Sequence, residues 1–430
     1  MNIKSRTPNV EGILPFKFYI AGISLIMQYS MIHFQSTVSR LFKFLLLLMF
    51  LFIGCGKQTE VMDSEPLLSV GHYFTEEEGA AFLNEVRQTY QTRGEWEERA
   101  ELIRRRILAG SGLSEFPERS PLNPVMGDER IYDGYKVRNV AFESLPGVYV
   151  TGSLYSPVDV DEDELPGILS PHGHWTEPGE VGRYRPNAQL RFASMARMGA
   201  HVFAFDMVGY GQLEEFGWEH HHPEAFKLQL WNNIRATDFL ISIGADPDRI
   251  ASTGASGGGS QTFFHTAIDD RVSVAAPVVM VSAHFFGGCV CESGMPVHRT
   301  EDFQSNNVEI AAAAAPRPLL LVSVGGDWTL NTPEVEYPHI RHVYELYGVP
   351  DLVENVHLAD ENHDYGYNKR AAVYPFLAKH LDLDLSKVIN NDGSLNEDGI
   401  VIEEQDVLYV FDDQTSYPEH ALRHNDEIVW

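Results

Sequence analysis

The stretch Arg249–Ile268, RIASTGASGGGSQTFFHTAI, decides the fold class of this 430-residue chain. An apolar run ends and a helical run begins at three consecutive glycines, although glycine in a helix costs about 1 kcal/mol relative to alanine. The residues around Ser256, GASGG, match the pattern G-x-S-x-G of a nucleophile elbow, in which a serine sits on a strained turn between a strand and a helix. Gly254 and Gly258 stand where larger side chains would collide with these two elements. The glycines therefore predict that Ser256 is held above a sheet as a nucleophile.

A serine nucleophile requires a base that is oriented by an acid, and in this elbow class the chain order is Ser, then Asp or Glu, then His. Asp327 follows the strand-like run LLLVSVGG, and His363 follows the last predicted strand. The alternative for Asp327 is an acid at a helix N-terminus, and the alternative for His363 is a surface histidine. Their order and their places at strand ends favour a Ser256–His363–Asp327 triad. Glu361 and Asp364 are weaker candidates for the acid because they are too near His363 in sequence to orient it.

His174, in the turn SPHGHW, is expected to direct its N–H at the same substrate oxygen as the N–H of Gly257. The alternative is a tight turn that only exposes aromatic side chains. Trp175 and Trp328 adjoin the expected oxyanion and acid residues, and both are expected to contact substrate.

Glu292 is a further candidate for contact with substrate. It lies in the long insertion 283–312, for which a surface lid is the open alternative. A uronate substrate would need a cation near Ser256, and Arg183, Arg185 and Arg299 are the candidates by position.

From Tyr135 onward the sequence is typical of an α/β protein. Two alternating stretches broken by Pro146-Gly147 predict a β-hairpin over 135–157. Apolar strands and amphipathic helices then alternate as far as Leu381, which predicts a mostly parallel, doubly wound sheet with helices on both faces, an α/β-hydrolase fold. The predicted strands lie within 165–173, 200–211, 249–256, 272–281, 318–327 and 351–363, and the predicted helices within 188–199, 226–244, 258–268, 334–348 and 367–381.

Four segments are expected along the chain. A leader over 1–55 precedes a tether with N-terminal helices over 56–134, a catalytic domain over 135–383 and an acidic extension over 384–430. The extension is expected either to pack on the core as a hairpin or to stay loosely attached.

The leader has the features of an export signal. Two cations precede an apolar run over 44–53 that is too short to span a bilayer, and the natural start is expected at Met31. The ending FIGC resembles a bacterial lipobox, with Cys55 as the lipidated residue. We expect a lipoprotein anchored to a bacterial membrane, with an uncleaved membrane anchor as the alternative.

The formal charge of −29, from 61 acidic and 32 basic residues, argues against nucleic acid as a partner. Cys289 and Cys291 are expected to form a disulfide or to remain reduced, and no further metal ligand is evident near them in sequence. The run His220 to His222 is expected in a loop over the mouth of the site. Neither a metal nor an organic cofactor is expected.

Several stretches resemble bacterial α/β-hydrolases of the acetylxylan esterase family, which is related to cephalosporin-C deacetylases and to prolyl-oligopeptidase catalytic domains. The resemblance covers about 135–381 and rests on TGASGGGSQTF, GGCVCE, QLWNNIRATDFL and APRPLLLVSVGGDWTLNTPEVEYPHIRHVYELYG. It implies Ser256 as nucleophile, Asp327 as acid, His363 as base, and Gly257 and His174 as oxyanion donors.

We therefore expect an exported serine esterase that hydrolyses acetyl esters on xylan, a related polysaccharide or a small ester. The alternatives are a glucuronoyl methyl-esterase, a prolyl-oligopeptidase-like peptidase, and a sugar-binding surface lipoprotein without activity. Only about 80 residues separate Cys55 from the first strand, too few for the β-propeller that such peptidases carry.

Overall fold

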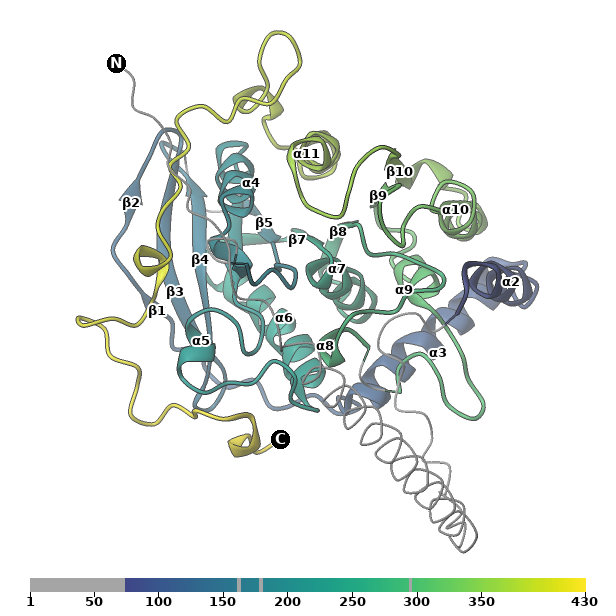
Figure 1. Cartoon of the computed structure of the whole chain (residues 1–430), viewed down its shortest axis with the longest axis horizontal. Helices are drawn as coiled ribbons and strands as arrows, with labels where there is room; N and C mark the ends of the chain where they lie inside the picture. Colours follow the sequence, from purple (N-terminus) through teal and green to yellow (C-terminus); the bar gives the residue numbers. More distant parts are fainter. Residues whose placement is uncertain (1–73, 161–163, 178–180, 294–295) are drawn as a thin grey trace, which may run out of the picture. The chain divides into compact units, whose positions relative to one another are not determined.

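A ten-stranded sheet forms the centre of the part of the chain that the computed structural model describes, residues 74–160, 164–177, 181–293 and 296–430 (Figure 1). The strands are β1 (Val125–Met126), β2 (Arg130–Ile131), β3 (Tyr135–Leu145), β4 (Val148–Pro157), β5 (Leu165–Leu169), β6 (His201–Phe205), β7 (Ala245–Ala255), β8 (Val272–Val278), β9 (Leu319–Val324) and β10 (Val353–Leu358). Their order is β1-β3-β4-β6-β5-β7-β8-β9-β10, and β2 pairs with β3 beside this path.

Six neighbouring strands, from β6 through β5, β7, β8 and β9 to β10, are parallel, whereas β3 and β4 form the antiparallel hairpin that was predicted. The hairpin turns at Gly147, whose φ of 78° lies in the left-handed region that glycine tolerates. This arrangement confirms the predicted α/β-hydrolase fold. Strands β1 and β2 were not predicted, because two residues are too few to show an alternating pattern.

Helices cover both faces of the sheet (Figure 1). The α-helices of the described residues are α2 (Glu76–Arg87), α3 (Arg93–Ser111), α4 (Pro186–Arg197), α5 (Gln212–Glu215), α6 (Ala225–Ser242), α7 (Gly257–Ile268), α8 (Val290–Ser293), α9 (Asn307–Ala312), α10 (Glu336–Leu346) and α11 (Tyr367–Leu381). Side chains alternate along β9: Leu319 and Leu321 join one buried cluster, with α3, α7 and α10, while Leu320 and Val322 join another, with α4 and α11. Because the strand buries both faces, its sequence is apolar apart from Ser323.

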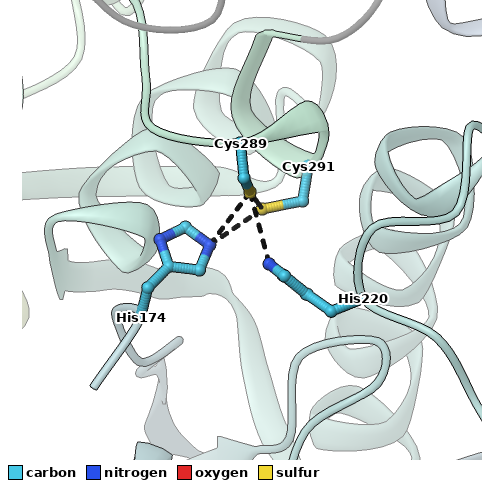
Figure 2. A group of neighbouring side chains, drawn as sticks. All are labelled: His174, His220, Cys289 and Cys291. Carbon is cyan, nitrogen blue, oxygen red and sulfur yellow. Dashed lines mark hydrogen bonds between the residues drawn. The ribbon is translucent and has the colours of Figure 1, made fainter. Parts of the chain in front are cut away.

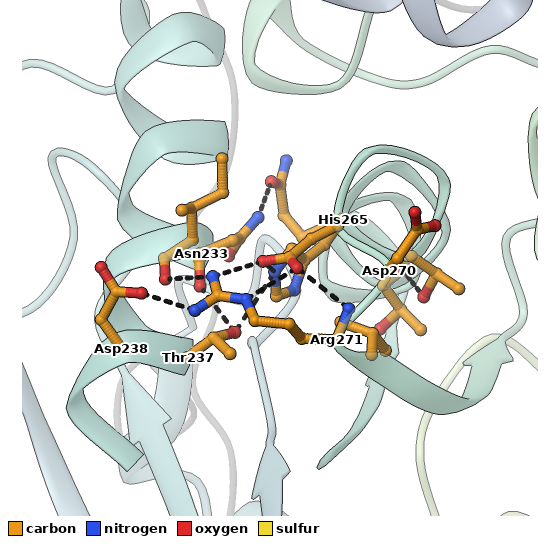
Figure 3. A network of polar contacts seen from close by, with 12 residues as sticks. Asn233, Thr237, Asp238, His265, Asp270 and Arg271 are labelled. Atoms are coloured by element: carbon orange, nitrogen blue, oxygen red, sulfur yellow. Dashed lines mark hydrogen bonds and ion pairs between the residues drawn. The ribbon is translucent and has the colours of Figure 1, made fainter. Parts of the chain in front are cut away.

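A partly buried polar network holds α7, the helix that follows the elbow, against α6 (Figure 3). Arg271, at the start of β8, pairs with Asp238 of α6 and with Asp269 at the end of α7, each at 2.6 Å. His265 of α7 lies 3.3 Å from both Asp269 and Thr237 of α6. The position of the elbow is thereby linked to the body of the molecule.

The C-terminal residues 384–430 pack on the core and contain no strand in the described structure. A single antiparallel bridge joins Ile389 to Leu395, and Leu408 and Phe411 are buried. The amide of Asn139 on β3 donates to the carbonyls of Val407 and Tyr409 farther along this segment.

The expectations for the leader, including Met31 and lipidation of Cys55, concern residues outside the described ranges. Within those ranges, no helix is both long and apolar enough to cross a membrane.

Candidate active site

The turn at Ser256 has the backbone conformation that a nucleophile elbow requires. Strand β7 ends at Ala255, α7 begins at Gly257, and Ser256 between them has φ 57° and ψ −126°. Its N–H donates to the carbonyl of Val278 on the neighbouring strand. This strained conformation presents the Ser256 hydroxyl, on a partly exposed residue, at the carboxyl edge of the sheet.

The glycines of the elbow are required by close backbone contacts. A Cβ atom on Gly254 would lie 2.4 Å from the carbonyl oxygen of Pro171, and one on Gly258 would lie 2.2 Å from the same atom. The loop after β5 therefore passes directly over the turn. Any side chain at these two positions would displace either the loop or the helix.

His363 and Asp327 form a hydrogen-bonded pair on the same edge of the sheet. His363 Nδ1–H donates to Asp327 Oδ2 at 2.7 Å. The other carboxylate oxygen, Oδ1, accepts from the N–H of Thr329 at 2.7 Å and from its hydroxyl at 2.5 Å. The Asp327 side chain is 2% exposed and that of His363 is 24% exposed, so the base reaches solvent while its acid does not. This hydrogen bond assigns the proton to Nδ1 and leaves Nε2 as the acceptor.

Trp175 and Trp328, which were expected to contact substrate, both lie beside the His363 ring. The Trp175 ring is stacked at 6.4 Å between centroids and the Trp328 ring lies at 4.6 Å. In the described structure no hydrogen bond joins Ser256 to His363; such catalytic contacts are often long before substrate is bound. Glu361 and Asp364, the weaker candidates for the acid, instead pair with Lys369.

The backbone N–H of Gly257 is available beside Ser256. Gly257 is the first residue of α7, so its N–H has no acceptor within the helix. The imidazole of His174 stands against it: a Cβ on Gly257 would lie 2.5 Å from that ring. The neighbouring His172 is buried, donates from Nδ1 to the carbonyl of Gly173 and accepts at Nε2 from the N–H of Met207. Burial lowers the pKa of His172 to about 3, so it is a neutral anchor for the loop.

The three arginine candidates have different surroundings. Arg183 is 1% exposed and pairs with Asp206 at 2.9 Å, so the expectation that it could hold a substrate carboxylate is corrected: its charge is already neutralised in the core. Arg299 is in an isolated bridge with Gln304. Arg185 lies over the face of Trp175 at 4.3 Å, next to the ring that stacks on His363.

Glu292 also differs from its expected role. Its side chain is 2% exposed, and its carboxylate accepts from the hydroxyl of Ser260 on α7 and from the N–H of Gly288. Burial raises its pKa. Glu292 is therefore held by Ser260 of α7 and by the backbone of its own insertion, because this insertion folds into the core. The insertion reaches the site through Phe285, whose ring stacks on Trp328 at 3.9 Å.

His174, His220, Cys289 and Cys291 come together beside the elbow (Figure 2). His174 Nε2 lies 3.0 Å from Cys291 Sγ, and His220 Nε2 lies 3.2 Å from Cys289 Sγ. The sequence showed no ligands near the two cysteines because these histidines are 117 and 69 residues away. Of the run His220 to His222, only His220 turns inward, since His221 is exposed and His222 pairs with Asp426.

Both cysteines are free and buried, and the pKa values of their thiols shift in opposite directions. A hydrogen bond from Cys291, with further ones from the two histidines, strongly lowers the pKa of the Cys289 thiol despite burial. Burial raises the pKa of Cys291 well above its ordinary value.

The sequence matches no family model and no curated protein. Among solved structures it is similar to Methylesterase BT1017, with 36% identity over 82% of this chain and 78% of that chain and a TM-score of 0.75. The chain belongs to the esterase family of that protein. A glucuronoyl esterase from Teredinibacter turnerae T7901 shares the fold, with 14% identity over 67% of this chain and 85% of that chain and a TM-score of 0.50.

This esterase is thus a carboxylic ester hydrolase with the α/β-hydrolase fold, as the motif resemblance implied. In sequence order, its elbow serine, acid and histidine follow the carboxyl ends of β7, β9 and β10. Open α/β sheets build their sites at that edge.

Proposed function

We propose that this protein is a serine esterase that hydrolyses methyl esters of uronic acid residues in a polysaccharide. The observation that carries the proposal is the strained elbow at Ser256 on the edge of the sheet that also holds the His363–Asp327 pair. Membership in a family with a methylesterase supports the choice of ester.

In the proposed mechanism, His363 Nε2 takes the proton of the Ser256 hydroxyl as the oxygen attacks the ester carbonyl. The N–H groups of Gly257 and His174 stabilise the oxyanion. The C–O bond to methoxide then breaks, and His363 returns the proton so that methanol leaves. Water hydrolyses the acyl-enzyme by the same route and releases the uronate carboxylate. Asp327 keeps Nδ1 protonated and stabilises the imidazolium.

The surroundings of His363 suit a sugar acid on the acyl side of the ester. Trp175 and Trp328 present aromatic surface next to the base, where a sugar ring can pack. Arg185 adds a positive charge beside Trp175, which favours a polymer that carries free carboxylates between its esters.

Acetyl esters on xylan are the second candidate, favoured by the motif resemblance around GGCVCE and GGDWT. In that reaction the sugar is the leaving group and the acyl group is small. The two candidates therefore place the sugar on opposite sides of the ester bond.

The test compares a methyl glucuronate or galacturonate ester, acetylated xylan, acetyl and octanoyl nitrophenyl esters, and a prolyl-nitroanilide. We expect the uronate methyl ester to have the highest kcat/KM. Faster turnover of acetylated xylan would establish the second candidate, and faster turnover of the anilide or the octanoyl ester would contradict both.

The nucleophile is tested in the same preparation. Ser256→Ala should lower turnover by on the order of 10⁶ and abolish fluorophosphonate labelling. Ser386→Ala, a change at an exposed serine of the C-terminal segment, is the matched control and should keep both. Equal labelling of wild type and Ser256→Ala would favour a binding protein without this chemistry.

We also propose that the protein is exported and anchored through lipid on Cys55, which the cations, apolar run and FIGC ending of the leader support. Incorporation of labelled palmitate should require Cys55. A Cys55→Ala variant that still incorporates it would contradict the anchor.

A further inference from the structure

We propose that His174, His220, Cys289 and Cys291 bind a zinc ion that holds the loop after β5 against the N-terminus of α7. Their four ligand atoms all lie within 4.8 Å of one another. They come from three segments: the loop after β5, the loop between α5 and α6, and the insertion at α8. An ion there would cross-link three segments that no disulfide joins.

The ligand set matches the chemistry of zinc. Two imidazoles and two thiolates are a standard structural set, and the two thiolate charges neutralise a divalent ion. With ordinary Zn–S and Zn–N bond lengths, ligand atoms in a tetrahedral shell are about 3.3–3.8 Å apart. The nitrogen–sulfur distances of 3.0, 3.2 and 3.3 Å are close to this spacing. The sulfurs, 2.7 Å apart, must separate by about 1 Å, a movement within reach of side-chain rotation.

An outer hydrogen bond orients His220 as a metal ligand. His220 Nδ1–H donates to the carbonyl of Val208 at 2.7 Å, which leaves its Nε2 lone pair directed at the sulfurs. His174 also faces the sulfurs through Nε2, while its Nδ1 lies 3.9 Å from the Glu292 carboxylate, too far for a hydrogen bond. A carbonyl behind a ligating imidazole, as at His220, is usual at zinc sites.

A disulfide between Cys289 and Cys291 explains this arrangement less well. The ring closed by a Cys-x-Cys disulfide is tight, and bridged sulfurs have no S–H to donate and accept only weakly. Two largely buried imidazoles would then point their Nε2 atoms at sulfurs that offer them no good partner. A bound cation satisfies all four groups at once.

The site is structural, because four protein ligands fill a tetrahedral shell and leave no position for substrate or water. The His174 ring also packs on Gly257, so the ion would fix the two residues whose N–H groups receive the oxyanion. This second role rests on the proposed function, whereas zinc binding does not.

The experiment measures metal content in the purified full-length protein after incubation with Zn²⁺ and removal of excess ion. We expect about one zinc per chain by mass spectrometry of the metal, and tetrahedral, thiolate-ligated Co²⁺ spectra after cobalt substitution. Cys289→Ser, Cys291→Ser and His220→Ala should each lose the ion. His222→Ala, which changes the adjacent histidine that pairs with Asp426, is the matched control and should retain it.

Absence of zinc from the wild-type protein, or retention of zinc by both cysteine variants, would overturn the proposal. So would a wild-type mass that is lower by two hydrogens, the sign of a disulfide, in place of a bound ion. Circular dichroism of each variant establishes that it is folded. If a variant does not fold, Co²⁺ spectra of the wild type still test for thiolate ligation.

Measurements of kcat distinguish failure of the catalytic role from failure of zinc binding. Removal of zinc with a chelator should lower kcat about 10- to 1,000-fold, as expected when an oxyanion donor is lost, and restored zinc should recover it. Ser256→Ala should bind zinc normally. Stoichiometric zinc with unchanged kcat after chelation would leave an ion site but overturn its positioning of the oxyanion loop.

Discussion

Asp327 has both carboxylate oxygens occupied. Thr329 holds Oδ1 through its N–H and hydroxyl, so Oδ2 is fixed toward His363. The adjacent Trp328 packs between Phe285 and His363, which restricts the base from the other side. One short turn after β9 therefore supplies the acid, its support and an aromatic wall of the site.

Asp327→Asn should lower kcat about 10³- to 10⁴-fold while the protein remains folded. An amide NH₂ would face Nδ1 and favour the tautomer with the proton on Nε2, which cannot accept from Ser256. The measurement is kcat on the preferred ester, with Asp364→Asn, which removes an acid paired with Lys369, as the control. Near-full activity of Asp327→Asn would assign the acid to another carboxylate.

The elbow depends on how closely the loop after β5 approaches α7. Pro171 meets Gly254 and Gly258 at distances that no Cβ tolerates, and Ser256 adopts a positive φ between them. The glycine run that weakens the start of the helix is thus what brings the loop carrying His174 over the nucleophile.

Gly258→Ala should reduce both stability and activity, because its Cβ would lie 2.2 Å from the Pro171 oxygen. Overpacking of this kind costs about 1–3 kcal/mol in the free energy of unfolding. Gly94→Ala on α3 is the matched control: no atom lies within 4 Å of its Cβ position, so it should be neutral or stabilising by up to about 1 kcal/mol. Denaturant unfolding measures both variants, and equal stabilities would contradict the tight approach.

The N-terminal helices and the C-terminal segment belong to the same packed unit as the sheet. Trp96 and Ile103 of α3 lie in the same cluster as α7 and α10, while Arg130 pairs with Glu403 across the antiparallel end of the sheet. The insertion is tied in as well, since the carboxylate of Glu336 on α10 accepts from the N–H of Ala283.

Glu336 makes the stability of the protein depend on pH. Burial raises its pKa from the ordinary 4.5 to about 7, with added repulsion from Glu76 and Glu334. The unfolded chain loses this proton near pH 4.5 and the folded chain keeps it to about 7, so the free energy of unfolding falls over this interval by up to about 3 kcal/mol.

Glu336→Gln keeps the acceptor for Ala283 and removes the titration. Relative to wild type, the variant should become more stable by up to about 3 kcal/mol as the pH rises from 5 to 8, measured by denaturant unfolding at each pH. Because the two proteins share all other titrating groups, the difference between their free energies of unfolding reports on Glu336. If the difference between the two free energies of unfolding does not change with pH, Glu336 ionises normally in the folded state.

The longer regular elements and the order of the candidate catalytic residues were predictable from sequence because both are local features. Apolar periodicity marks the longer strands and helices, the glycines mark the elbow, and Asp327 and His363 directly follow strands whose carboxyl ends must meet at one edge of a parallel sheet. The roles of Glu292, Arg183 and His220 were not predictable, because each depends on a partner from a distant segment or on burial. Glu292 folds beneath Ser260, Arg183 is neutralised by Asp206, and His220 reaches Cys289 across 69 residues. Such contacts arise only when packing brings separate segments together, since no periodicity or spacing along the chain encodes them.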